Sequence, residues 1–395
     1  MDQECYIEAV MDSKYYDYII AGAGASGLSL LVRLLLSKQF NDKRILLIDK
    51  SEKTTNDKTW CFWEKENGVF EKIVFRQWQH LNFYSDGFSK KLDILPYKYK
   101  MIRSSDFYNY CFDQIKTQPN VDIVYDAIED FTSAKEGVIV KTSTASYQAK
   151  FIFNSIAIRT ELKKGRYNLL QHFKGYIIET ETDVFDENAA TLMDFRIKQK
   201  DETRFVYVLP FDKKTALVEY TVFSESLLAE TEYDEELKNY INSYITSGNY
   251  SIKDTEFGVI PMTDSMYKSH EGNIIHIGTA GGLTKASTGY TFQFIQKHSD
   301  YILDCLLKDD LTTLKKPTNN RFGFYDATLL HLLFHKKIKA TEIFTNLFRN
   351  NKAERVLAFL ENESMLADEL KIFAKLPVGK FSAAAAAIIL QRFSK

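Results

Sequence analysis

The sequence contains little cysteine, little proline and almost no net charge. Its 395 residues include 4 cysteines and 6 prolines, and 51 basic side chains against 53 acidic ones give a formal charge of −2. The cysteines lie far apart and form no C-x-x-C pair, which argues against a disulfide framework or a zinc site and favours a reducing compartment. The balanced charge argues against a nucleic-acid partner. We therefore expect no metal, no nucleic acid and a cytoplasmic location.

Long apolar runs are also absent. The longest, residues 28–36, is short and contains Arg33, whereas a membrane-spanning helix needs about 20 apolar residues. The first residues show neither the basic nor the apolar segment of a signal peptide. We expect a protein that is soluble or lies on a membrane face, and its length predicts two subdomains plus a terminal extension.

The most informative feature present is a dinucleotide fingerprint. A short apolar strand pattern runs into Gly22, Gly24 and Gly27, which are followed by a helical pattern, and a second strand pattern ends about twenty residues later in Asp49. The first glycine permits a tight turn, the second lets a pyrophosphate approach the backbone, and the third lets the helix pack against the strand. The N–H groups at the helix start would face the phosphates, and the acid would bind a ribose. We assign to this cofactor segment Gly22, Gly24, Ala25, Ser26, Gly27, Asp49 and Lys50.

The remaining patterns predict an α/β fold in which a Rossmann-like nucleotide-binding domain is interrupted by an antiparallel sheet. Residues 17–50 read as a β-α-β unit, and Ser104 begins a helical pattern that reaches residue 117. This architecture is typical of flavoproteins of the aromatic-hydroxylase superfamily, in which the sheet covers a substrate cavity. Runs that alternate apolar and polar residues, as antiparallel strands do, are 175–181, 191–197, 204–209 and 215–223. Other expected elements are strands at 121–125, 137–142, 146–153 and 273–277 and a helix at 235–247.

Domain boundaries follow from these patterns. The nucleotide-binding domain takes residues 1–80, 101–170 and 260–310, and the antiparallel-sheet substrate domain takes residues 81–100 and 171–259. From about residue 310 onward the pattern is mostly helical. Residues 311–395 therefore form a helical C-terminal region, which is a candidate membrane-facing cap.

A second glycine-rich segment, residues 278–290, follows a strand pattern and precedes a helical one. Such a turn at a helix start can present several N–H groups to one anionic edge, such as the N1/C2 side of a flavin. The alternative is an ordinary connection with a Ser/Thr cap. Given the first fingerprint, we favour cofactor contact by Gly278, Thr279, Ala280, Thr288, Gly289 and Tyr290.

Glu219 is the candidate acid. On a strand it shares a face with Leu217, Thr221 and Phe223. A carboxyl group on an apolar face is desolvated, which raises its pKa and suits it to general-acid chemistry. The opposite register, with Glu219 in solvent, is the competing interpretation because glutamate is seldom fully buried.

Two further segments leave structural alternatives open. Asp194 and Arg196 share a strand face and could simply pair with each other. Trp60 and Trp63 follow the second nucleotide strand and could line a cavity near the cofactor, or belong to the core.

Together these segments resemble the lycopene β-cyclases of the bacterial flavoprotein type, closest to the flavobacterial form. The most specific matches are residues 57–64, 192–196 and 217–221, and residues 102–108 and 278–290 also match. The resemblance implies FAD, active in its reduced form, with NAD(P)H as the electron source. It also implies that the essential glutamate of the family falls on Glu219, although the next residue is Tyr220 rather than a second acid.

Other implied positions follow from the same resemblance. Asp194 falls on a Met-Asp run of the family, and Arg103 matches an arginine that faces the pyrophosphate. Thr279 stands where many related flavoproteins have an aspartate, so backbone contacts must suffice there. Residues assigned to the substrate cavity are Trp60, Trp63, Phe195 and Tyr220.

The implied activity is the acid-catalysed, non-redox cyclisation of lycopene to β-carotene through a monocyclic intermediate, γ-carotene, which is formally an isomerase reaction. Glu219, assisted by Asp194, would manage the proton, and the reduced flavin would stabilise the carbocation. One alternative is a flavin-dependent monooxygenase or reductase acting on an apolar isoprenoid. Another is a non-catalytic protein that binds prenyl lipids.

A long hydrocarbon substrate partitions into bilayers, so we expect peripheral association with the inner face of the cell membrane. The candidate surface is the segment 344–349, with Phe344, Leu347, Phe348 and Arg349, near the lysines at 336, 337 and 339. The alternative is an amphipathic helix packed on its own domain.

Overall fold

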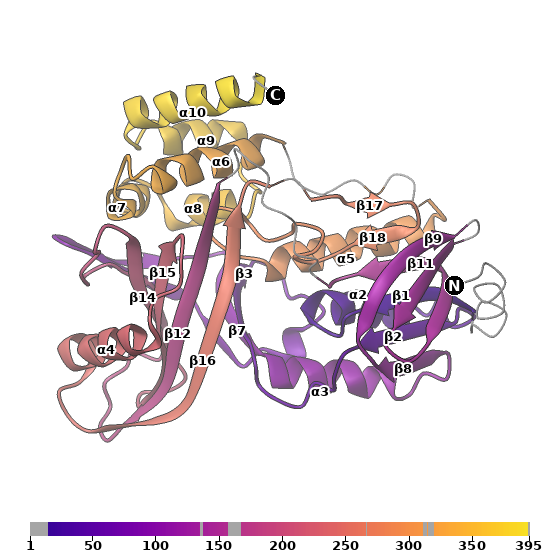
Figure 1. Cartoon of the computed structure of the whole chain (residues 1–395). Helices are drawn as coiled ribbons and strands as arrows, with labels where there is room; N and C mark the ends of the chain where they lie inside the picture. Colours follow the sequence, from indigo (N-terminus) through magenta and orange to yellow (C-terminus); the bar gives the residue numbers. More distant parts are fainter. Residues whose placement is uncertain are drawn as a thin grey trace.

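A computed structural model describes residues 15–134, 137–156, 167–265, 267–310, 314 and 320–393. The first residues, where we expect no signal peptide, lie outside this described part. Three sheets and several helical layers make up the molecule, with the nucleotide-binding part on the right of Figure 1 and the C-terminal helices above its left half.

The nucleotide-binding part is built on an eight-stranded sheet. Its parallel core has the order β18-β11-β1-β2-β8, and β1 pairs with both β2 and β11 in parallel register. This arrangement confirms the expected β-α-β unit and the α/β fold class. The strands are β1 (Tyr15–Ala21), β2 (Ile45–Asp49), β8 (Val121–Tyr125), β9 (Ile128–Ala134), β10 (Gly137–Thr142), β11 (Ser146–Asn154), β17 (His270–Glu271) and β18 (Ile274–His276). The helices packed here are α2 (Ala25–Ser37), α3 (Ser104–Ile115) and α5 (Phe292–Leu307).

A seven-stranded sheet of order β16-β12-β15-β14-β13-β5-β6 forms the second part. Its neighbouring strands are antiparallel except for the β13–β5 pair. The strands are β5 (His80–Ser85), β6 (Phe88–Asp93), β12 (Asn168–Thr180), β13 (Ala189–Asp194), β14 (Thr203–Pro210), β15 (Thr215–Ser224) and β16 (Tyr250–Thr263). Because side chains alternate along a strand, Val206, Val218 and Val222 form one apolar face, which α4 (Glu230–Tyr240) and the π-helical segment Ile241–Ile245 cover.

The opposite face of this sheet meets a third, three-stranded sheet of order β3-β7-β4. Trp63 and Tyr99 from the small sheet share a buried core with Tyr207, Leu217 and Phe223 of the large one. The small sheet consists of β3 (Thr59–Glu64), β4 (Arg76–Trp78) and β7 (Lys98–Arg103), and the 3-10 turn Glu71–Ile73 precedes β4.

The C-terminal helices pack over the end of β12 and β16 (Figure 1). They are α6 (Asn320–Phe334), α7 (Ala340–Asn350), α8 (Ala353–Leu360), α9 (Leu366–Phe373) and α10 (Val378–Phe393). Phe344, Leu347 and Phe348 are at most 4% exposed and belong to the same core as Phe83 and Phe195. Our expectation that these three side chains form a membrane-facing surface is therefore wrong, because their apolar stripe packs on the protein itself.

Exposed apolar side chains gather instead around α9 and α10. The largest exposed fractions are 74% for Met365, 68% for Leu390 and 60% for Leu370. Within the described residues no single helix is long and apolar enough to cross a membrane, although α9 and residues 378–391 meet the same criterion as a pair bent by 120°.

Candidate active site

The first glycine turn has the geometry of a phosphate-binding loop. Gly22 has a φ of +98°, which glycine adopts without strain, and its N–H donates to Ile48 O at 2.7 Å. A Cβ on Gly27 would lie 2.0 Å from Gly22 O, so only glycine lets α2 approach the strand. A Cβ on Gly24 would meet no atom within 4 Å, so open space lies over the backbone at the start of α2, where Ala25 and Ser26 begin the helix.

Asp49 lies at the end of β2, beside this turn. Its Oδ2 accepts a hydrogen bond from Ala23 N at 2.7 Å, and its Oδ1 accepts one from Ser51 N at 3.1 Å and pairs with Lys53 at 3.0 Å. The carboxylate thus orders the turn itself. Lys50 is exposed directly after it.

The two predicted cofactor segments meet in space although about 250 residues separate them. Gly278 has a φ of +61°, and a Cβ there would lie 2.8 Å from Ser26 Cβ at the start of α2. Thr279 and Ala280 follow in a turn closed by the hydrogen bond from Gly282 N to Thr279 O. The structure therefore brings the second loop onto the first helix start, as a shared cofactor site requires.

Arg103 lies at the end of β7, next to α3. Its guanidinium forms a two-pronged hydrogen-bonded pair with Asp106, at 2.7 and 3.1 Å, and stacks on Phe75 with 3.9 Å to the ring centroid. The cation is thus already held by the protein, and its role toward a pyrophosphate stays a prediction.

Glu219 takes the predicted register. Leu217 and Phe223 belong to the core opposite α4, and Thr221 Oγ1 donates to Glu219 Oε1 at 3.0 Å. Glu219 therefore faces the small sheet rather than the α4 side.

Glu256 on the edge strand β16 is a second acid that the sequence reasoning missed. Gly175 on β12 lies directly opposite Glu219 on one side and directly opposite Glu256 on the other. A Cβ on Gly175 would lie 3.2 Å from Glu256 Cγ and 3.6 Å from Glu219 Cβ. The missing side chain lets the two carboxyl groups meet, and they are hydrogen bonded to each other.

The small sheet supplies the opposite wall. Thr59 Oγ1 donates to Glu256 Oε2 at 2.6 Å, and the Cys61 thiol lies close enough for the charge of Glu219 to raise its pKa, after burial itself. The half-buried carboxyl pair thus lies between β3 and the large sheet.

These surroundings change the pKa values of both carboxyl groups. Burial, and then the neighbouring Glu256, raise the pKa of Glu219 well above its usual range. Burial also raises the pKa of Glu256, while the Thr59 hydroxyl acts in the opposite direction. Two hydrogen-bonded carboxyl groups must hold at least one proton between them, so the site stores a proton.

Aromatic side chains surround the pair. Burial also raises the pKa values of Tyr207 and Tyr290, whose phenol groups interact with each other and with Glu219. Tyr290 packs edge-on against Trp63, with 4.5 Å between ring centroids. Within the described residues, Thr288 Oγ1 is a buried polar atom without a hydrogen-bond partner.

The other predicted cavity residues, Trp60, Phe195 and Trp63, pack chiefly against neighbouring rings. Trp60 stacks on Phe292 at 5.8 Å within the nucleotide-binding part, and Phe195 stacks on Phe344 at 5.8 Å in the core. Trp63 is 1% exposed. These rings support the walls of the site more than they line it.

Asp194 and Tyr220 do not share a site with Glu219, contrary to our expectation. Asp194 is fully buried, pairs with Arg196 at 2.6 Å and accepts a hydrogen bond from Tyr240 on the α4 side. Tyr220 follows Glu219 in a strand, so it points to the opposite face, where Arg204 donates to its hydroxyl at 2.9 Å. Both belong to the structural side of the sheet.

An apolar cavity of about 290 Å³ opens between the C-terminal helices and the second glycine loop. Ser287 and Thr288 stand at its loop end, and Thr288 precedes Gly289, which packs on Gln171 of β12. On the side of the C-terminal helices, the cavity is lined chiefly by Phe324, Leu329, Leu347, Phe359, Phe381 and Ala385.

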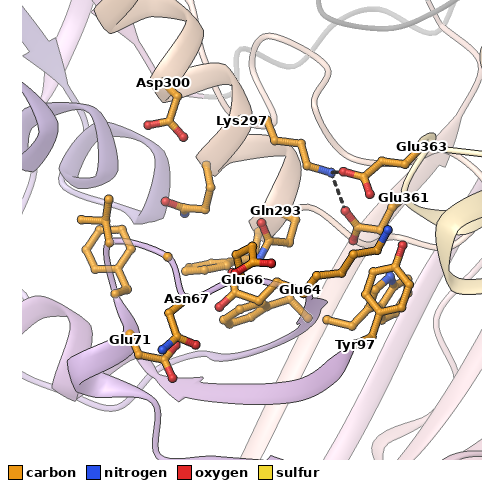
Figure 2. A pocket seen from close by; sticks show the side chains of 18 of the residues that line it. Glu64, Glu66, Asn67, Glu71, Tyr97, Gln293, Lys297, Asp300, Glu361 and Glu363 are labelled. Atoms are coloured by element: carbon orange, nitrogen blue, oxygen red, sulfur yellow. Dashed lines mark hydrogen bonds and ion pairs between the residues drawn. The ribbon is translucent and has the colours of Figure 1, made fainter. Parts of the chain in front are cut away.

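A larger cavity of about 470 Å³, with both charged and aromatic lining residues, lies elsewhere, between residues 64–71, α5 and the turn after α8. Figure 2 shows that its labelled side chains are mostly carboxylates and amides, with Lys297 reaching Glu361 at 2.7 Å and Glu363 at 2.8 Å. Lys100, buried, pairs with Glu64 at 2.7 Å and with Glu71. Most acidic side chains around this cavity form ion pairs with lysines or arginines of the protein. We assign this cavity no part in the proposed chemistry.

Known proteins with similar sequences or structures include a lycopene cyclase and two flavoproteins. The chain is 24% identical to the lycopene beta-cyclase of Pantoea ananas over 293 residues, which cover 70% of this chain and 71% of that protein. A flavoprotein/dehydrogenase structure from Cytophaga hutchinsonii has a TM-score of 0.63 at 11% identity, covering 96% of this chain and 100% of the other. A probable FAD-dependent monooxygenase from Pseudomonas aeruginosa has a TM-score of 0.55 at 12% identity, covering 88% and 100%. The fold is therefore that of FAD-dependent flavoproteins.

The sequence profile described as lycopene cyclase protein matches residues 17–386. This match includes both glycine segments, the strand that bears Glu219 and most of the C-terminal helices. The chain belongs to the lycopene cyclase family.

Proposed function

We propose that this protein is a flavin-dependent lycopene β-cyclase, which closes the ψ-ends of lycopene into β-rings by acid catalysis without net redox change. The observation that carries the proposal is Glu219, a half-buried carboxyl group with a raised pKa, which lies on an aromatic face near the second glycine loop. A proton donor in such surroundings suits an apolar alkene better than a polar substrate.

The residues present fit FAD. The open space over Gly24, the helix start at Ala25 and the contact between Gly278 and Ser26 leave backbone N–H groups free to hold the pyrophosphate. The loop 287–290 would hold the ring edge, with the unpartnered Thr288 hydroxyl available as a donor. A reduced flavin bound there would supply negative charge next to a positive carbon, and NAD(P)H would be its reductant.

The protein's own residues manage the proton. Glu219 adds a proton to the terminal double bond of the substrate, which leaves a tertiary carbocation, and the neighbouring double bond attacks it to close a six-membered ring. Loss of a ring proton then forms the β-ring. Aromatic walls such as Tyr207 and Tyr290 exclude water, which would capture the cation as an alcohol.

The apolar cavity of the C-terminal helices is the proposed path of the hydrocarbon. It ends at Ser287 and Thr288, next to the loop that would hold the flavin ring edge. The exposed apolar residues of α9 and α10 lie on the same helices as residues that line this cavity. They would dock on the inner face of the cell membrane, where the substrate dissolves.

Docking is tested by vesicle sedimentation of the purified protein. Leu366→Glu combined with Leu370→Glu should weaken binding at least about tenfold, because burying each leucine side chain contributes about 1.5–3 kcal/mol. Leu36→Glu, an equally apolar exposed site on α2, is the matched control. Equal binding of all three proteins would contradict this docking surface.

The function itself is tested by anaerobic incubation of the FAD-loaded protein with lycopene in vesicles and excess reductant. The proposal expects γ-carotene and then β-carotene, with no oxygen requirement. Oxygen uptake matched to NAD(P)H consumption would instead identify a monooxygenase. Tight lycopene binding without any product would identify a lipid-binding protein.

A further inference from the structure

The contact between Glu219 and Glu256 depends on an unusual arrangement of strands. The two glutamates stand on β15 and β16, which are separated by β12. Two strand spacings amount to roughly 10 Å, and the side chain of the middle strand normally fills that gap. Here the middle residue is Gly175, and its missing Cβ leaves room for both carboxyl groups.

The surroundings of the two acids differ. Glu256 accepts a hydrogen bond from Thr59 and is attracted by the positive charge of Lys58. Both interactions stabilise the negative charge of Glu256. Glu219 likewise accepts a hydrogen bond from Thr221, but burial and the charge of Glu256 disfavour a negative charge on it. The asymmetry places the proton on Glu219 and the charge on Glu256.

We propose that Glu219 and Glu256 act as one proton-sharing pair, in which Glu256 is a positioning residue that keeps the proton on Glu219 until the substrate takes it. This inference rests on the proposed function. The second acid of the pair comes from the edge strand β16 and not from position 220, which lies on the α4 face of the sheet.

The charges balance over one ring closure. The resting pair carries one proton and one negative charge. Proton transfer to the substrate breaks the O–H bond of Glu219, forms a C–H bond and leaves two carboxylates, whose combined negative charge favours the nearby carbocation. The proton lost when the β-ring forms restores the pair, directly or through solvent, so nothing is oxidised or reduced.

Other titratable groups face the pair from each packed element. These are Tyr207 on β14, Tyr290 on the second glycine loop, Cys61 on β3, Lys58 before β3, and Asp254 on β16. Burial keeps the phenols and the thiol neutral near pH 7, because it raises their pKa values. The titration near neutral pH is therefore assigned to the two carboxyl groups.

Infrared difference spectroscopy during a pH titration of the FAD-loaded protein tests the pair without requiring turnover. The wild type should keep a carboxylic-acid C=O band at neutral pH, and Glu219→Gln should remove it. Glu256→Gln should lower the titration midpoint of that band by at least about one pH unit, because the neighbouring negative charge is gone. Gly175→Ala should lower the midpoint too, since the added methyl group separates the acids.

Cyclisation assays add a readout that a merely structural role would not give. At neutral pH, Glu256→Gln should lose about tenfold in rate or more, and more acidic buffer should restore part of it. Glu179→Gln, which removes an exposed carboxylate from β12, and Gly248→Ala, in an exposed turn, are matched controls that should change neither readout.

The proton-sharing pair would be contradicted if the infrared titration midpoint were unchanged in Glu256→Gln. It would also be contradicted if the wild type showed no protonated carboxyl group at neutral pH. If no variant and no wild-type sample converts lycopene while the infrared titration behaves as expected, the proposed function fails and the proton-sharing pair stands.

Discussion

The two faces of the seven-stranded sheet come from the same strands and are built in opposite ways. On the α4 face, the polar groups satisfy one another: Asp194 pairs with Arg196 and Tyr240, Arg204 binds Tyr220, and His172 bonds to Ser224 and Tyr233. On the other face, two acids share a hydrogen bond and the buried Thr288 hydroxyl lacks a partner among the described residues. One face is complete by itself, whereas the other is arranged for groups that the protein chain does not supply.

The pKa values of the carboxyl groups on the two faces also differ. On the α4 side, the hydrogen bond from Arg204, with a further one from Lys200, lowers the pKa of Glu232. On the opposite side, burial raises the pKa of Glu219. Paired charges stabilise a fold, and a raised carboxyl pKa stores a proton for chemistry. The comparison therefore separates structural from functional acids within one sheet.

The largest effect is expected from Glu219→Gln. Removing a general acid should lower kcat by about 10²–10⁴, while FAD still binds, because no glycine segment changes. The measurement is the rate of ring closure at saturating lycopene, together with the visible flavin spectrum. Full activity of this variant would remove Glu219 from the mechanism.

Asp194→Asn should show the reverse pattern. The fully buried carboxylate anchors Arg196 and Tyr240, so the free energy of unfolding should fall by about 1–3 kcal/mol. The rate per folded molecule should stay within about twofold of the wild type. Chemical denaturation and the cyclisation assay measure the two quantities, and a large loss of kcat at unchanged stability would return Asp194 to the active site.

The apolar cavity provides a third contrast, between neighbouring residues of α10. Ala385 lines the cavity, whereas Ala386 is exposed. Ala385→Trp should fill the cavity and raise KM for lycopene about tenfold, since an obstructed path weakens substrate binding. Ala386→Trp should leave KM unchanged, and equal effects in both variants would argue against this path.

The smallest effect concerns the dependence of stability on pH. A carboxyl group with a raised pKa binds more protons in the folded than in the unfolded state, so it makes stability fall as pH rises above the ordinary glutamate value of 4.5. Glu219→Gln should flatten that fall. Glu232→Gln should instead remove stability that is present above 4.5 and lost as pH falls below it, because the pKa of Glu232 is lowered. Denaturation at several pH values distinguishes the two signs.

Local patterns predicted much of the nucleotide-binding part. The glycine turn, β8 at residues 121–125 and β10 at residues 137–142 appear where their sequences placed them, because short-range periodicity and turn residues determine such elements. The period of two along a strand grouped Glu219 with Leu217, Thr221 and Phe223 but left open whether that face meets solvent, and the family resemblance favoured a site there. The same period, applied to the next residue, would have placed Tyr220 on the opposite face.

The second acid could not be predicted in this way. Strand β16 lies at an edge, has exposed charged residues and contains Gly258 and Pro261, so it lacks clear alternation. The meeting of Glu219 with Glu256 depends on the register of three strands and on the absence of a side chain at Gly175. Neither property is local, and only the folded sheet reveals them.

The central claim is that a carboxylic acid of this protein protonates the substrate during a non-redox ring closure. Cyclisation of lycopene in D₂O, followed by mass spectrometry of the product, tests it most directly, because the added proton stays on carbon. The account predicts one deuterium for each ring closed in the wild type, and almost no product from Glu219→Gln. Cyclic product without deuterium, or product that contains oxygen, would contradict it.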